Sequence, residues 1–237
     1  MNLLAVTGTG TEVGKTVVTA AIVALANEAG QRVAVVKPAQ TGVADGDESD
    51  VAAVRRLTGV DDMHELIRYP DPLAPATAAR RAGVSALGVD VMAREIQQLH
   101  DRDLILVEGA GGMLVHLDDS GRTLADLADA VNAPVVVVAA AGLGTLNAVA
   151  LTCEAIRHRG LACHGVVVGS WPAEPDLAAQ ENLTDIEAYA GAPLLGAMPA
   201  GSGRLDRAAF LATARASLGP ELGGRWTGPE TTNSRPA

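Results

Sequence analysis

Six nearly continuous apolar runs, separated by segments of helical periodicity, restrict the fold of this chain more than any other feature. They lie at residues 2–7, 32–38, 103–109, 133–141, 163–170 and 192–199. Helices are expected at residues 14–29, 48–57, 88–100, 145–159, 174–190 and 206–217, with a short one opened by Thr123. Unbroken Val, Ile, Leu and Ala are typical of parallel strands covered on both faces. The pattern predicts an α/β fold, a single doubly wound and mostly parallel sheet with helices on both faces.

Two stretches lack this periodicity. Residues 68–79, RYPDPLAPATAA, hold three prolines and are predicted to be irregular, because proline removes a backbone donor and biases the preceding residue away from helix. Residues 219–237 are rich in Gly, Pro and Thr and are predicted to form a disordered tail. Residues 1–218 are therefore expected to form one domain.

The composition argues against two classes of partner. The chain has 237 residues and a formal net charge of −10, from 18 Lys and Arg against 28 Asp and Glu. An acidic surface repels phosphate backbones, and an aromatic content of 2% leaves few platforms for base stacking, so no nucleic acid is expected. No run reaches the roughly 18 apolar residues of a membrane helix, so no membrane is expected either. Cys153 and Cys163 lack metal-ligand spacing and are interpreted as buried thiols, which favours a cytoplasmic location.

The first apolar run ends in a phosphate-binding loop. Residues 8–16 read GTGTEVGKT, so five residues separate Gly8 from Gly14, one more than in the commonest form of this loop. Small residues let successive N–H groups turn inward around phosphate oxygens, and the following helix points its positive end at them. Lys15 is then expected to reach the β- and γ-phosphates, and the Thr16 hydroxyl to bind Mg²⁺. These residues predict a nucleoside triphosphate site of the P-loop NTPase type.

Lys37 follows the second apolar run and precedes a proline. One interpretation is a lysine that extends from the sheet edge into solvent. The other places a second ammonium group beside Lys15 and over the γ-phosphate. At 4 Å and an effective dielectric near 20, each charge contributes about 4 kcal/mol. This attraction grows as charge develops during phosphoryl transfer, so Lys37 and Lys15 are the predicted catalytic residues.

Two acidic side chains complete the predicted metal site. Glu108 ends the third apolar run, and Asp50 follows an acidic loop. With Thr16 they supply three oxygen ligands for Mg²⁺, and phosphates and water supply the rest. For Asp50 a solvated helix start is the alternative, because Asp47 and Glu48 are close neighbours in the sequence.

Together the motifs resemble the dethiobiotin synthetase family, the ATP-dependent carboxylases of biotin biosynthesis. The matching blocks are TGTGTEVGKT (7–16), KPAQTG (37–42), SD (49–50), VEGAGG (107–112), LGTLN (143–147) and PLLGAMP (193–199). The resemblance implies a ligase that uses Mg²⁺, ATP, CO2 or bicarbonate, and 7,8-diaminopelargonic acid. One amine would become a carbamate, the carbamate would attack the γ-phosphate, and the second amine would displace phosphate to close a ureido ring.

The resemblance also implies which residues bind. The nucleotide would contact Thr11, Glu12, Val13, Gly14, Lys15, Thr16, Val17, Asp50, Glu108, Gly109, Ala110, Gly111, Gly169, Ser170, Pro199, Ala200 and Gly201. The diamine would contact Lys37 and Thr41, and its carboxylate would meet a helix start across a homodimer interface, at Gly144, Thr145, Leu146 and Asn147. Many family members carry Asn-Asp where this chain has GSWP (169–172), so another triphosphate such as CTP is expected to be accepted.

Two other functional assignments fit the sequence less well. Partition and septum-site ATPases carry a lysine near the start of the loop, and residues 9–13 here are TGTEV. Cobyrinate-type amidoligases need a glutaminase domain, for which 237 residues leave no room.

Overall fold

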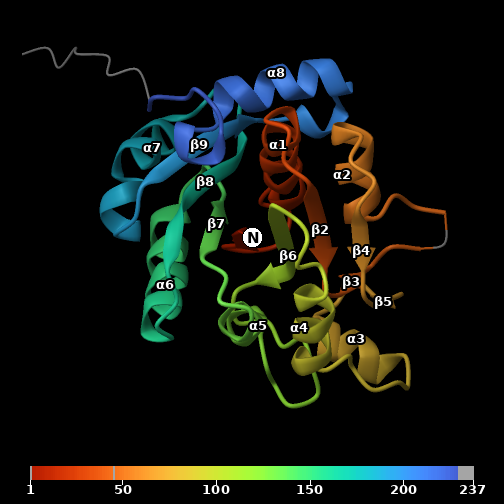
Figure 1. Ribbon diagram of the computed structural model, residues 1–237. Helices are drawn as coiled ribbons and strands as arrows, with labels where there is room; N and C mark the ends of the chain where they lie inside the picture. The colour runs from red at the N-terminus through yellow and green to blue at the C-terminus, as the bar shows by residue number, and fades with distance from the viewer. Residues whose placement is uncertain (1, 45, 229–237) are drawn as a thin grey trace, which may run out of the picture.

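The computed structural model describes residues 2–44 and 46–228. Its main feature is a seven-stranded sheet in the order β4-β2-β6-β1-β7-β8-β9, in which every pairing is parallel (Figure 1). The strands are β1 (Asn2–Gly8), β2 (Val33–Lys37), β4 (Met63–Glu65), β6 (Leu104–Gly112), β7 (Val135–Ala139), β8 (Cys163–Trp171) and β9 (Leu194–Pro199). All six apolar runs form strands of this sheet, which confirms the predicted fold class.

Helices cover both faces of the sheet (Figure 1). One face packs against α1 (Lys15–Glu28), α2 (Asp50–Thr58) and α8 (Arg207–Ser217). The other packs against α4 (Val89–Gln97), α5 (Leu124–Ala130), α6 (Thr145–His158) and α7 (Leu177–Ala190). Successive strand residues point to opposite faces of the sheet. Because helices cover both faces, every residue of β2 and β7 is buried. None of the described helices is both long and apolar enough to cross a membrane.

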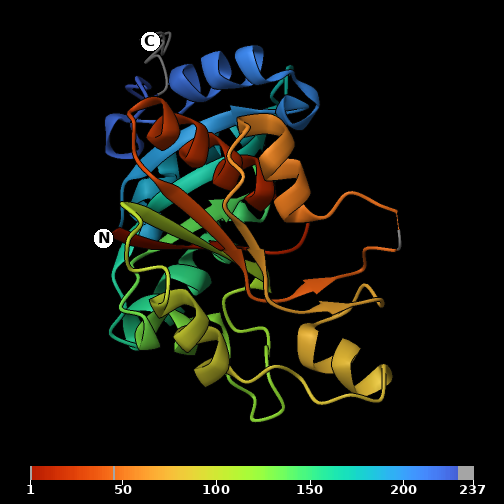
Figure 2. The ribbon, with the colours of Figure 1, turned by 45° about the vertical axis from the view of Figure 1, so that its right-hand side comes forward.

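The prediction that residues 68–79 are irregular is wrong. Arg68–Tyr69 forms β5, which pairs in parallel with β3 (Gln40–Thr41), and Pro75–Arg81 forms α3. Figure 2 shows this group extending from the β2–β4 edge of the sheet. Pro75 lies in the first turn of α3, where its missing N–H leaves no helical hydrogen bond unmade. Tyr69 is buried, and its hydroxyl accepts a hydrogen bond from the Leu87 N–H at 3.1 Å.

The predicted tail is ordered in its first part, contrary to expectation. After a one-turn helix η1 (Ser202–Arg204) and α8, the chain forms a second such turn, η2 (Pro220–Leu222). Leu222 is buried, and the Trp226 N–H donates to the Leu218 carbonyl at 2.9 Å. Leu222 and Trp226 pack against the core, and this packing orders residues 219–228 although their Gly and Pro content favours disorder. The rest of the predicted tail, residues 229–237, lies outside the described residues.

Candidate active site

A cavity of about 450 Å³ lies beyond the carboxyl ends of β1, β2 and β6, where parallel sheets bind ligands. Its lining combines the phosphate-binding loop with the ends of the two neighbouring strands. The residues are Thr11, Glu12, Gly14, Lys15, Thr16, Val17, Lys37, Gln40, Thr41, Gly42, Val43, Asp50, Glu108, Ala110 and Gly111. Both predicted catalytic lysines and all three predicted metal ligands are among them.

The loop has the geometry that its glycines predict. Gly14, with a φ of 96°, turns the chain into α1, which begins at Lys15. The Lys15 ammonium folds back over the loop and donates to the Gly10 carbonyl at 2.8 Å. Burial and the neighbouring charge of Lys37 lower the pKa of Lys15. Lys15 and Lys37 both line this cavity.

Lys37 lies at the centre of the site and is 3% exposed. Its Nζ is 2.5 Å from Asp50 Oδ2 and 2.9 Å from Glu108 Oε1, and it also donates to the Gly109 carbonyl at 3.2 Å. The Thr16 hydroxyl donates to the same Glu108 oxygen at 2.9 Å. Glu108 Oε1 therefore connects Lys37 to Thr16 of the phosphate-binding loop. Lys37 is not a solvent-exposed residue at the sheet edge, and Asp50 is not only a solvated helix start.

The charges of this cluster stabilise one another. Burial by itself would lower the pKa of Lys37, but the carboxylates of Glu108 and Asp50 together raise it above the ordinary lysine value. Burial would raise the pKa of Asp50, and the Lys37 ammonium outweighs it and lowers that pKa. The lysine is therefore charged near neutral pH, and Asp50 is ionised. Such a buried group can stabilise an anion without any proton transfer.

The same oxygens suit a divalent cation. Among residues 2–44 and 46–228, no three His, Cys, Asp or Glu side chains converge into a metal cluster made by protein alone. Two carboxylates and the Thr16 hydroxyl do converge, and the two carboxylates already share one cation, the Lys37 ammonium. Mg²⁺ is commonly held by one or two carboxylates with phosphates and water. The donor set fits that ion.

The residues predicted to contact the base do not line this cavity. Gly169 is buried under the phosphate-binding loop, and a Cβ there would lie 2.1 Å from the Val13 carbonyl oxygen. A Cβ on Gly14 would lie 2.4 Å from the Gly169 carbonyl oxygen. Both positions therefore need glycine so that the loop can rest on the end of β8. Ser170, Pro199, Ala200 and Gly201 lie at the ends of β8 and β9, and the Ala200 N–H donates to the Trp171 carbonyl at 2.7 Å.

Of the residues predicted to bind the diamine, Lys37 and Thr41 line the cavity. Gly144, Thr145, Leu146 and Asn147 form the start of α6, beyond β7, and are not part of its lining. Gly109 lies behind the cavity, where it accepts a hydrogen bond from Lys37. Gln40, Gly42 and Val43 also line the cavity, although no motif singled them out as site residues. The signal for Gln40 was available, because it is a polar residue between Lys37 and Thr41 in the KPAQTG block.

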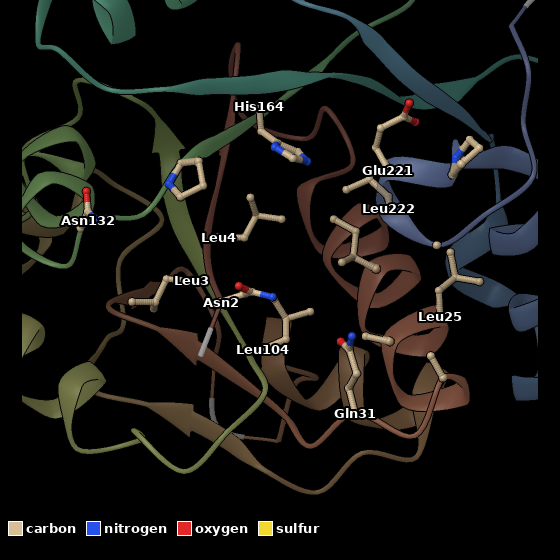
Figure 3. A pocket seen from close by; sticks show the side chains of 16 residues that line it. Asn2, Leu3, Leu4, Leu25, Gln31, Leu104, Asn132, His164, Glu221 and Leu222 are labelled. Atoms are coloured by element: carbon tan, nitrogen blue, oxygen red, sulfur yellow. The ribbon is translucent and has the colours of Figure 1, made fainter.

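A larger cavity, of about 580 Å³, lies at the opposite end of the sheet (Figure 3). Leu3, Leu104 and His164 line it from the amino ends of β1, β6 and β8, with Leu222 on a further side. Its described lining contains no lysine or arginine that would hold a phosphate. We therefore assign the chemistry to the smaller cavity.

Comparison with known proteins agrees with this geometry. The family described as an AAA domain matches residues 2–203. Proteins named ATP-dependent dethiobiotin synthetase BioD are 64% identical in Frankia casuarinae, with 97% of both chains covered, and 62% identical in Saccharopolyspora erythraea, with 96% of this chain and all of the relative covered.

Among solved structures, the septum site-determining protein MinD of Pyrococcus horikoshii, in complex with Mg-ADP, has a TM-score of 0.59 at 15% identity, with 94% of each chain covered. A chain of the MinC:MinD cell division protein complex of Aquifex aeolicus has a TM-score of 0.53 at 14% identity, with 91% of this chain and 95% of the other covered. At these identities the likeness shows the fold alone. The dethiobiotin synthetases, in contrast, match along nearly the whole length at more than 60% identity, and the chain belongs to the ATP-dependent dethiobiotin synthetase family.

Proposed function

We propose that this protein is the carbon–nitrogen ligase that forms dethiobiotin from 7,8-diaminopelargonic acid, CO2 and ATP in biotin biosynthesis. The observation that carries the proposal is the position of Lys37. A buried, charged lysine from β2 lies in the same cavity as Lys15 and Thr16 of the phosphate-binding loop. In a ligase, a cation at this position would stabilise the group that receives the phosphoryl.

The chemistry follows from this arrangement. One amine of the diamine adds to CO2 and loses a proton, which gives a carbamate anion. A carbamate oxygen attacks the γ-phosphorus and ADP leaves. The second amine then attacks the carbamoyl carbon, and phosphate leaves as the ring closes. Lys37 would stabilise the carbamate and the transferring phosphoryl group, Lys15 would hold the phosphates, and Thr41 would contact the diamine.

Thr16, Asp50 and Glu108 would hold Mg²⁺. When bound, the ion would neutralise charge on the β- and γ-phosphate oxygens. Asp50 and Glu108 also pair with the Lys37 ammonium, so the carboxylates that would hold the ion also fix the position of the lysine.

The nucleotide base would lie near Gly169 and Ser170, with Pro199, Ala200 and Gly201 opposite. Gly169 is covered by the phosphate-binding loop, and Ser170 is exposed with only a hydroxyl to offer. A site without a side-chain amide has little means of rejecting a different base. We therefore expect a second triphosphate, such as CTP, to serve beside ATP.

We further propose that the protein works as a homodimer in the cytoplasm. Leu143, just before α6, is 92% exposed, and the adjoining Gly144 has a φ of 92°. The family resemblance implies the dimer, and Leu143 lies where the second copy would meet the start of α6. There the start of α6 would receive the substrate carboxylate.

The direct test is incubation with the diamine, bicarbonate, Mg²⁺ and ATP, CTP, GTP or UTP in turn. The cyclic urea is scored by mass, and phosphate release is measured in parallel. We expect urea formation with ATP and one phosphate per ring closed. Nucleotide hydrolysis without urea would refute the proposed function, and urea formation with ATP alone would refute only the expectation of relaxed base choice.

A further inference from the structure

Gln40 is a buried polar residue that the roles described above do not use. Its side chain is 4% exposed, and its backbone N–H donates to the Ile67 carbonyl at 2.9 Å. This bond ties it to the start of β5 in the small sheet. The side chain then reaches toward α2. Its Nε2 donates to the Thr41 carbonyl at 3.3 Å, and its Oε1 accepts from the Asp50 N–H at 3.1 Å.

The bond to Asp50 spans the base of a loop. Residues 42–49 connect β3 to α2, and this connection contains Gly42 and Gly46, both at positive φ. Asp50 is the first residue of α2, so its N–H has no partner within the helix. Gln40 supplies that partner from a strand end only ten positions earlier in the sequence.

Two contacts therefore fix Asp50 relative to β2 and β3. The first is the ion pair between its carboxylate and Lys37. In the proposed reaction the Lys37 ammonium also binds the carbamate. Asp50 therefore shares this lysine with the substrate. The second contact is the hydrogen bond that the Asp50 N–H donates to Gln40 Oε1, which involves only the backbone of Asp50 and does not use its carboxylate oxygens.

We infer that Gln40 is a positioning residue for the metal site, because it holds the first residue of α2 where the Asp50 carboxylate faces Glu108 and Thr16. The inference rests on the proposed function. Gln40 acts through Asp50, and its loss affects cation binding more than the binding of nucleotide in the absence of metal.

The test compares three variants with the wild-type protein. Gln40→Met keeps the length of the side chain and removes both hydrogen bonds. Gln40→Glu keeps an oxygen for the Asp50 N–H. Ile186→Ala is the control, because it removes buried apolar volume from α7 on the other face of the sheet, and Ile186 does not line the cavity.

Binding of Mn²⁺ is measured by electron paramagnetic resonance at saturating ADP, and binding of ADP is measured separately in EDTA. The half-saturating Mg²⁺ concentration for ring closure is determined alongside kcat. For Gln40→Met we expect Mn²⁺ and Mg²⁺ to bind about fivefold more weakly, the equivalent of about 1 kcal/mol, with ADP affinity in EDTA unchanged. Gln40→Glu is expected to bind Mn²⁺ at least as well as the wild type.

Unchanged Mn²⁺ binding by Gln40→Met would overturn the inference, and so would an equal loss in Ile186→Ala. A loss of ADP binding in EDTA would overturn it too, because it would make Gln40 a nucleotide contact. Failure of the proposed function has a different signature, in which the wild-type protein binds Mn²⁺ and ADP but forms no cyclic urea.

Discussion

Replacement of Gly169 by alanine tests how the phosphate-binding loop is supported. The added Cβ would lie 2.1 Å from the Val13 carbonyl oxygen and 3.1 Å from Gly14 Cα, whereas ordinary contact begins near 3.4 Å. Val13 and Gly14 are backbone neighbours that cannot rotate away, so the loop must retreat by about 1 Å. A misplacement of that size lowers a rate by about 10²-fold, and we expect that loss in kcat/KM for ATP.

The assay is steady-state ring closure at varied ATP, together with thermal unfolding. Overpacking costs about 1–3 kcal/mol of stability, so a control must lose stability without moving the loop. Val168→Ala meets this need, because it removes two buried methyl groups from the adjacent position at a cost of about 2 kcal/mol. Unimpaired kcat/KM in folded Gly169→Ala, or an equal loss in Val168→Ala, would refute the reasoning.

Three further predictions concern the charged cluster and the thiols. Lys37→Ala should lower kcat by roughly 10² to 10³, because one stabilising charge is lost; a folded variant with wild-type turnover, checked by thermal unfolding, would exclude a catalytic role. Glu108→Gln should raise the Mg²⁺ concentration needed for half-maximal rate, and an unshifted Mg²⁺ titration would mean that Glu108 is only structural. The hydrogen bond with Cys153, at 3.8 Å between the sulfurs, lowers the pKa of Cys163 to about 7. Since the thiolate is the nucleophile, alkylation of Cys163 by iodoacetamide should rise with pH to half its limit near pH 7. Cys153→Ala, which removes the hydrogen-bond donor, should move that midpoint upward; an unchanged midpoint in this variant would contradict the assignment.

Much of the fold could be predicted because its signals are local. Six apolar runs became strands, and the glycines around Lys15 produced the turn into α1. The failures have equally local causes. Proline favours an irregular segment in general, but Pro75 lies in the first helical turn, where proline is tolerated. The strand β4 has three residues and is too short to show a periodic pattern.

The site was predictable in part, for the same reason. In a parallel sheet the polar residues that follow each strand share one edge, so Lys37 and Glu108 could be placed near the loop from their positions in the sequence. Because many members carry Asn-Asp where this chain has GSWP, the family resemblance implies a role at the base for Gly169. Its position under Val13 depends on how the loop packs on β8, and no pattern within either segment reveals that contact.

Chain order and hydrophobic pattern thus specified a parallel sheet, a phosphate-binding loop and two lysines at one edge. Three-dimensional packing decided which partners these groups have. The pairing of Lys37 with Glu108 joins residues 71 positions apart, and the bond from Thr16 to Glu108 joins residues 92 positions apart. Backbone preferences act over a few residues, whereas contacts at such separations depend on strand order, register and side-chain packing throughout the sheet.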